Sequence, residues 1–102
     1  MGTRLELQSK LEELLGSRQI YYQPPESIKM EYPAIVYSKS KIDIDRANDS
    51  VYTKNTRYEI TVIDKKPDNP VIEKLLACFS YCTHDRYYKA DNLNHDVLTL
   101  YY

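Results

Sequence analysis

The sequence predicts an α+β domain, in which a mostly antiparallel sheet of four to five strands carries two helices on one face. Two segments, near the N-terminus and after Asn69, show the apolar spacing of amphipathic helices. Several others show the alternation and the β-branched and tyrosine content of strands. The predicted order is α-β-β-β-α-β-β. With 102 residues, the chain fits a single domain over residues 1–102.

Residues 3–15 are predicted to form the first helix. Thr3 and Glu6 have capping-box spacing, and Gly16 stands where a C-terminal cap belongs. The leucines recur at i, i+4, i+7 and i+8 and make one apolar stripe: Leu7, Leu11, Leu14 and Leu15. Residues 17–32, which include Pro24-Pro25, are predicted to form a connector that lies flat on the domain.

The next segment predicts a strand at 33–39 and a charged, projecting hairpin around 39–57. Residues 46–50 are a turn cluster, and residues 51–53 begin the return strand. Residues 56–64 alternate clearly between apolar and polar side chains, which predicts a half-buried strand. Because a projecting hairpin has unpaired edges, it favours contact with another chain.

The C-terminal part predicts a helix followed by two strands. Asn69 is a plausible N-cap, Pro70 fits the first helical position, and the helix is expected over about 70–79. Its expected apolar face comprises Val71, Ile72, Leu75, Leu76 and Phe79. Strands are expected at 87–90 and 95–102, with a turn at 91–94.

Charge and composition exclude several classes of protein. The chain has 14 Lys and Arg against 15 Asp and Glu, which argues against a strongly basic nucleic-acid coat. No apolar segment is long enough to span a membrane. The 11 tyrosines stand beside one Phe and no Trp, so tyrosine is expected to replace Phe in the core, to serve interfaces, or both.

Candidate catalytic and metal-binding residues are few, so we expect no enzyme, cofactor or metal site. Cys82 and His84 are close in sequence, but a catalytic pair normally meets through the fold. Cys78 and Cys82 lack a second ligand pair and are expected to be free, mostly buried thiols. Asp43 and Asp45 share a strand face that is expected to be solvated.

Three stretches carry a resemblance: Tyr32–Tyr37 (YPAIVY), Tyr58–Asp64 (YEITVID) with Pro67-Asp68, and Tyr88–Asp96 (YKADNLNHD). On these the chain, over about 33–102, resembles small tail-completion proteins of phages and prophages of Gram-positive bacteria. These include tail terminators and head–tail joining proteins. The resemblance implies a structural subunit that forms a ring, typically hexameric, capping the tail tube and docking the head connector.

The resemblance implies partners in turn: further copies of the chain, the tail tube protein and the head–tail connector, with DNA passing through the lumen without specific binding and no membrane. It implies a place in the virion, at the tail or neck, and in the host cytoplasm during assembly.

The subunit contacts are expected at Lys41, Asp43, Arg46, Tyr52, Arg57 and Leu93. The alternatives are another minor tail or neck component, a small nucleic-acid-binding α+β module, and a small enzyme that uses Cys82 and His84.

Overall fold

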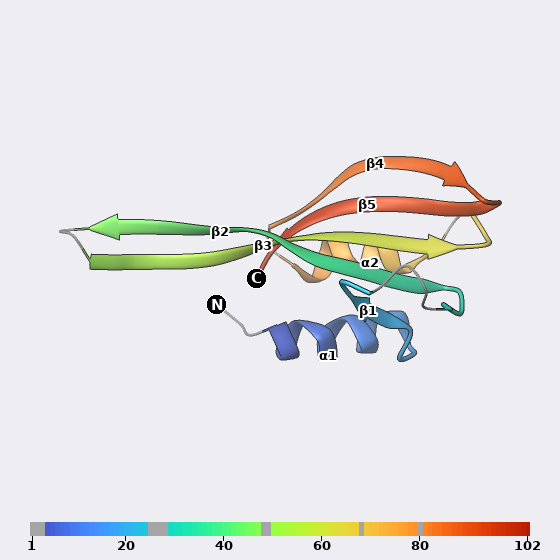
Figure 1. Ribbon diagram of the computed structural model, residues 1–102, viewed down its shortest axis with the longest axis horizontal. Helices are drawn as coiled ribbons and strands as arrows, with labels where there is room; N and C mark the ends of the chain where they lie inside the picture. Colours follow the sequence, from blue (N-terminus) through green and yellow to red (C-terminus); the bar gives the residue numbers. More distant parts are fainter. Residues whose placement is uncertain (1–3, 25–28, 48–49, 68, 80) are drawn as a thin grey trace.

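The computed structural model of the chain describes residues 4–24, 29–47, 50–67, 69–79 and 81–102, and between residues 41 and 55 it describes the backbone alone. The fold is α+β in the predicted element order (Figure 1). The elements are α1 (Arg4–Leu15), β1 (Ile20–Tyr22), β2 (Ala34–Ala47), β3 (Ser50–Asp64), α2 (Val71–Cys78), β4 (Cys82–Ala90) and β5 (Leu93–Tyr101).

The five strands form one mixed sheet with the order β1-β2-β3-β5-β4. β1 runs parallel to β2, and each of the other neighbouring pairs is antiparallel. Both helices lie on the same side of the sheet (Figure 1). Neither described helix is long and apolar enough to cross a membrane.

The core lies between the helices and one face of the sheet. Leu7 and Leu11 of α1 and Leu75 of α2 are fully buried. From the sheet, alternate residues of three strands reach the same cluster: Ile35, Tyr37, Tyr58, Ile60, Val62, Leu98 and Leu100. The register explains the common face, because Tyr37 pairs with Ile60 and Ile60 pairs with Leu98.

Three tyrosines form part of this core beneath α1. Tyr37 is 1% exposed, and its ring centroid lies 4.8 Å from that of Tyr22 and 6.0 Å from that of Tyr58. The Tyr37 hydroxyl donates to Gln8 Oε1 and accepts from Arg4 Nη1 at 3.3 Å. Tyrosine therefore does replace Phe in the core, and α1 supplies the polar partners that a buried hydroxyl requires.

The strand boundaries differ from the prediction in three places. The connector predicted at 17–32 contains a strand, β1, because Ile20 is buried and pairs with Ile35. The predicted strands at 33–39 and 56–64 continue through the hairpin as 14 and 15 residues. β4 begins at Cys82 rather than at residue 87, and the turn before β5 is two residues long rather than four.

The ends of both helices follow local chemistry. Gly16 has φ of +81°, and its N–H donates to Glu12 O at 2.9 Å, so the predicted C-terminal cap of α1 is present. Asn69 Oδ1 accepts from the N–H of Val71 at 2.9 Å, as predicted for the start of α2. The predicted apolar face of α2 is too wide, because Leu76 is 39% exposed. Thr3 lies outside the described residues.

Candidate interaction surfaces

The distal hairpin, which we define as residues 41–47 and 50–55, projects beyond the body of the domain (Figure 1). β1 pairs with β2 only at residues 35–37, and β5 begins to pair with β3 only at Arg57. In the described backbone, the strands of the distal hairpin therefore pair with each other alone. The molecule measures 51 Å along its longest axis and 29 and 23 Å across.

Four of the predicted contact residues lie on this hairpin: Lys41, Asp43, Arg46 and Tyr52. The backbone places Lys41 opposite Arg57, Asp43 opposite Asn55, and Arg46 opposite Val51. The side chains of all four residues, and that of Asp45, are outside the part of the chain whose side chains the structure describes. The predicted role of these four residues in subunit contact stays a prediction.

Arg57 marks the base of the hairpin rather than its exposed part. Its Nε donates to Ser40 Oγ at 3.0 Å, and Ser40 Oγ in turn donates to Arg57 O at 3.1 Å. Ser40 sits at a register shift between Lys39 and Lys41, where β2 leaves the body. These contacts join half-buried Arg57 to β2 at the base of the hairpin, and its predicted role in subunit contact stays a prediction.

Leu93, the last predicted contact residue, is half-buried at the start of β5 and pairs with Ala90. The turn before it consists of Asp91 and Asn92, with φ of +53° and +62°. Two consecutive residues with positive φ are typical of a type I′ hairpin turn. The Tyr88–Asp96 stretch is therefore the β4–β5 hairpin, in which the Tyr88 and His95 rings stack at 4.6 Å.

The exposed edge strand β4 is a surface that the sequence did not single out. Every residue from Thr83 to Lys89 is exposed. Three of the large exposed apolar side chains lie on or beside this strand, namely Tyr81 (73%), Tyr87 (49%) and Tyr88 (40%). Tyrosine is enriched in protein interfaces, and the described tyrosines include both core residues and these three at the β4 edge.

Two of these tyrosines are held in fixed positions. Tyr87 donates its hydroxyl hydrogen bond to Asn94 Oδ1, and Tyr88 stacks on His95. The Arg86 guanidinium lies 5.7 Å from the centre of the Tyr88 ring. Because these rings are already ordered, a partner that packs on them loses little further side-chain entropy.

Asp85 interrupts the pairing of β4. The register shifts between His84 and Arg86, so Asp85 forms a bulge in the strand. Its carboxylate accepts hydrogen bonds from Thr83 Oγ1 at 3.2 Å and from Thr99 Oγ1. Edge bulges with a charged residue hinder the addition of another strand, so β4 is suited to contact through its side chains.

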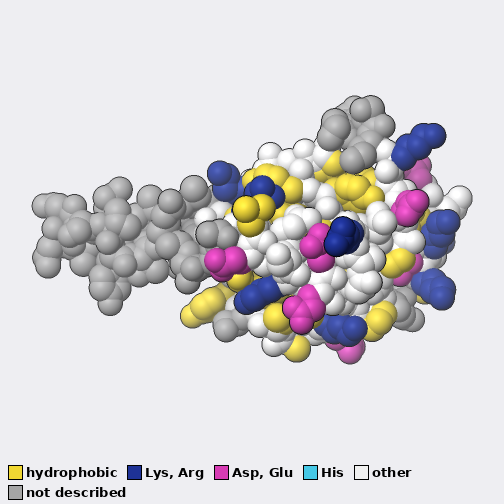
Figure 2. Space-filling view, turned by 90° about the horizontal axis from the view of Figure 1, so that it is seen from below, with side chains coloured by type: hydrophobic (Ala, Val, Ile, Leu, Met, Phe, Trp, Pro, Cys, Tyr) yellow, Lys and Arg dark blue, Asp and Glu magenta, His cyan; other side chains and the backbone are white. Residues whose placement is uncertain are grey.

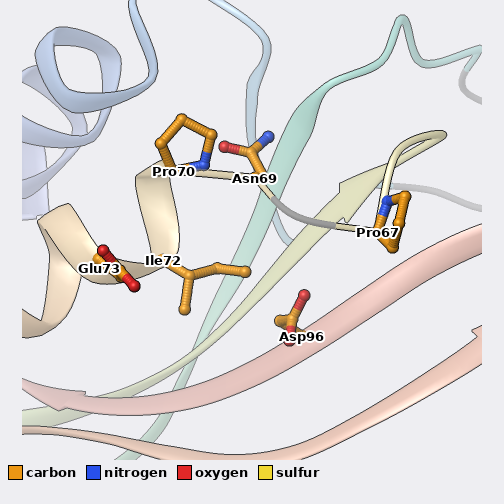
Figure 3. Close-up of a pocket in the computed structure, with 6 residues that line it drawn as sticks. All are labelled: Pro67, Asn69, Pro70, Ile72, Glu73 and Asp96. Carbon is orange, nitrogen blue, oxygen red and sulfur yellow. The ribbon is translucent and has the colours of Figure 1, made fainter.

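A cleft of about 380 Å³ lies between the start of α2 and β5 (Figure 3). Pro67 and Asn69 come from the loop before α2, and Pro70, Ile72 and Glu73 from the beginning of the helix. Asp96 rises from β5 toward this loop. Figure 3 shows the Ile72 side chain extending from α2 toward the same space.

Asp96 is nine-tenths buried and is bound to the edge strand. Its Oδ1 lies 2.9 Å from His84 Nε2. Asn94, two residues earlier on the same face, donates from Nδ2 to the carbonyls of Asp64 and Lys65 at 3.3 Å each. Polar contacts from β5 therefore connect β4 on one side and the loop after β3 on the other.

Cys82 and His84, the residues of the enzyme alternative, have different surroundings in the described structure. Burial raises the pKa of the Cys82 thiol, and Asp85 raises it further, which favours the unreactive protonated form. His84 instead contacts Asp96. The expectation of mostly buried thiols is wrong for Cys78, which is exposed. In the part of the chain that the structure describes, no three metal-binding side chains gather.

Two surfaces escaped the sequence reasoning for different reasons. The edge position of β4 depends on the strand order, although its run of polar and tyrosine residues after residue 82 is a usable signal. The cleft joins residues some 25 positions apart and has no local sequence signal. No family model matches the chain, and no curated protein matches it.

Proposed function

We propose that this protein is a structural subunit of a phage tail, a tail terminator or head–tail joining protein that acts by assembling into a ring. Its partners in this proposal are further copies of the chain, the tail tube and the head connector. The ring, most simply a hexamer, caps the tube and leaves a lumen for DNA. The proposal rests on the resemblance over residues 33–102 and on the surfaces described above.

The distal hairpin is the observation that carries the proposal. An isolated two-stranded ribbon is only marginally stable in water, whereas three or more strands with a covered face are stable. A ribbon about seven residues long that pairs only with itself in the described backbone gains stability when it packs against another chain. A ring provides that chain in every copy.

The hairpin and the β4 edge are different surfaces on one subunit. A contact between two different patches is heterologous, and it closes into a ring when the rotation between copies permits. The ordered tyrosines of β4 suit such a contact because aromatic anchors carry much of the energy of interfaces. A two-fold dimer would instead require one patch to meet itself.

The charge distribution suits a ring through which DNA passes. The net charge is −1, and Figure 2 shows acidic and basic side chains interspersed over the helix-bearing side. A strongly basic lumen would hold phosphates tightly, because binding to DNA is dominated by neutralisation of its backbone. A near-neutral chain avoids this.

The test is the molar mass by light scattering across a range of concentrations, with negative-stain images of the same sample. We expect closed rings at about six times the chain mass of 12.0 kDa. A variant in which Asn-Gly replaces residues 43–55 shortens the hairpin with a favourable turn and is expected to stay monomeric. Glu13→Gln, on an exposed position of α1, is the matched control and is expected to form rings.

Two results would contradict the proposal. One is a hairpin-shortened variant that folds and assembles like the unmodified protein. The other is a monomer that binds DNA or RNA with a steep dependence on salt, which is the behaviour of a nucleic-acid-binding module.

A further inference from the structure

We propose that the β4 edge of one copy of the chain binds the acidic strand face of the distal hairpin of the next copy. This inference rests on the proposed function, because it names the two surfaces that meet when copies assemble. The observations behind it are the cations of β4, the ordered tyrosines between them and the placement of charge along the hairpin.

The β4 edge carries two cations without an acidic partner in the described part of the chain. Arg86 and Lys89 are both exposed, and neither forms an ion pair with a described residue. Asp85 lies beside Arg86, but its carboxylate accepts hydrogen bonds from the hydroxyl groups of Thr83 and Thr99. The two unpaired positive charges favour an acidic partner.

Two ordered tyrosine rings stand between these cations. Tyr87 donates to Asn94 Oδ1, and Tyr88 stacks on His95. Residues 86–89 therefore present two aromatic side chains with a cation on either side. Because aromatic residues and arginine are the usual anchors of interfaces, the complementary segment combines apolar and acidic residues.

The distal hairpin carries such a segment at residues 42–45, Ile-Asp-Ile-Asp. In the backbone register, Asp43 lies opposite Asn55. Asp45, two residues further along β2, lies opposite Thr53. Residues two apart on a strand share a face, and both opposing residues are uncharged, so this strand face is acidic.

The basic residues of the hairpin are placed differently. Lys41 pairs with Arg57 at the base, and Lys54 pairs with Ile44 on the other strand face. Arg46 follows a register shift close to the turn. The acidic face is therefore the part of the hairpin whose charge complements the β4 edge.

A second copy is the partner because the two surfaces belong to one chain and do not meet within it. β3 and β5 lie between β2 and β4 in the sheet, and the hairpin projects away from the body (Figure 1). A nucleic acid fits less well, since Asp85 lies beside Arg86 and the net charge is −1. Each copy thus has two different, complementary surfaces, as a heterologous contact requires.

The first test uses charge-reversed variants of the complete chain in light scattering. The hairpin variant is Asp43→Lys with Asp45→Lys, and the edge variant is Arg86→Glu with Lys89→Glu. Each variant alone brings like charges together and should weaken self-association at least about ten-fold. In an equimolar mixture, every contact between unlike copies joins opposite charges, so association should return to that of the unmodified protein.

Two controls change the net charge by the same amounts at exposed positions elsewhere. Glu13→Lys with Glu73→Lys matches the hairpin variant. Arg18→Glu with Lys74→Glu matches the edge variant. Both controls should associate like the unmodified protein, and circular dichroism checks that each variant is folded.

The second test isolates a single contact. The ¹⁵N-labelled hairpin-shortened variant keeps the β4 edge, and the unlabelled edge variant keeps the hairpin, so only one kind of contact can form between them. We expect saturable NMR shifts at residues 86–89. The unlabelled hairpin variant, added in its place, should cause none.

An absence of shifts at residues 86–89 would overturn the proposal. So would a reversed variant that assembles as well as an assembling unmodified protein, or a mixture that assembles no better than its separate components. Single-stranded DNA that shifts residues 86–89 while the edge variant does not would identify a nucleic-acid surface instead. Shifts with the edge variant, but no closed rings of the unmodified protein, would support this contact and contradict the proposed ring.

Discussion

β4 and β5 are consecutive antiparallel strands of nine residues each, yet they have opposite environments. In β5, residues 94, 96, 97, 98 and 100 are buried, whereas β4 is exposed from Thr83 to Lys89. β5 lies between β3 and β4, and α2 packs on the sheet beside it, while β4 pairs on one side only in the described structure. The comparison shows that the position of a strand in the sheet, rather than its length, decides whether its residues are buried or exposed.

The largest expected effect comes from truncating a buried residue of β5. Leu98→Ala removes methyl groups from a fully buried site and should lower the free energy of unfolding by about 2–5 kcal/mol. Urea denaturation followed by circular dichroism measures this change. A loss below about 1 kcal/mol would show that β5 is not part of the core.

The buried tyrosines extend the comparison, because they are core residues and those of β4 are not. Tyr37→Phe removes the hydroxyl that contacts Gln8 and Arg4, and it should cost about 1–2 kcal/mol of unfolding free energy. Tyr81→Phe, at an exposed site, is the control and should leave the unfolding free energy unchanged. Equal effects at the two positions would contradict this division.

The same tyrosines predict a loss of stability in alkali. Burial raises the pKa of Tyr37 and of Tyr58 above the ordinary value of 10.0. The folded protein therefore holds these protons more tightly than the unfolded chain, and stability is complete below pH 10 and falls as the pH rises above it. Denaturation at several pH values between 8 and 11 measures how steeply the free energy of unfolding falls with pH, and Tyr37→Phe should make this fall less steep. An unchanged fall would show that other groups cause it.

The turn between β4 and β5 is expected to show a smaller effect. Asn92 has φ of +62°, a conformation that alanine adopts less readily than asparagine or glycine. Asn92→Ala should therefore cost about 1 kcal/mol, and Asn92→Gly should be as stable as the unmodified protein. Thermal denaturation of the pair is the measurement. Equal loss in both variants would assign the effect to the asparagine side chain rather than to the backbone.

The smallest effect on folding is expected at β4 itself. Arg86→Ser changes an exposed residue and should alter the unfolding free energy by less than about 0.5 kcal/mol. If β4 is a contact surface, the same variant should weaken self-association in light scattering. A large loss of stability with unchanged self-association would contradict this, because β4 would then contribute to folding rather than to contact.

Local patterns predicted much of the fold. The leucine spacing of α1, the cap at Gly16, the Asn69 side chain at the start of α2 and the alternation of Tyr58, Ile60 and Val62 are all present. Each depends on residues near one another in the chain, where hydrogen bonding and side-chain periodicity act directly. β1 was missed because three residues are too short for a periodic signal, and its pairing with β2 is not local.

The candidate surfaces were predictable only in part. The charged hairpin was expected, and its backbone does extend beyond the neighbouring strands. Arg57 was predicted as a contact residue from projection and charge, and that role stays a prediction. Its hydrogen bond to Ser40 was not predicted, because it depends on pairing across the hairpin. The β4 edge and the Asp96 cleft were not predicted. The first depends on the order of the strands and the second on the position of α2, and a local sequence pattern predicts neither.

The sequence by itself determined the α+β class, the order of the elements, the Gly16 cap of α1 and the Asn69 contact at the start of α2, because these follow from local conformational preference and apolar spacing. Only the tertiary structure decided that β5 is central and β4 is an edge, that Tyr37 is buried while Tyr81 is exposed, and that Asp96 faces α2. The physical reason is that burial and pairing arise between segments distant in the chain, so the same tyrosine or aspartate acquires its role from its neighbours in space.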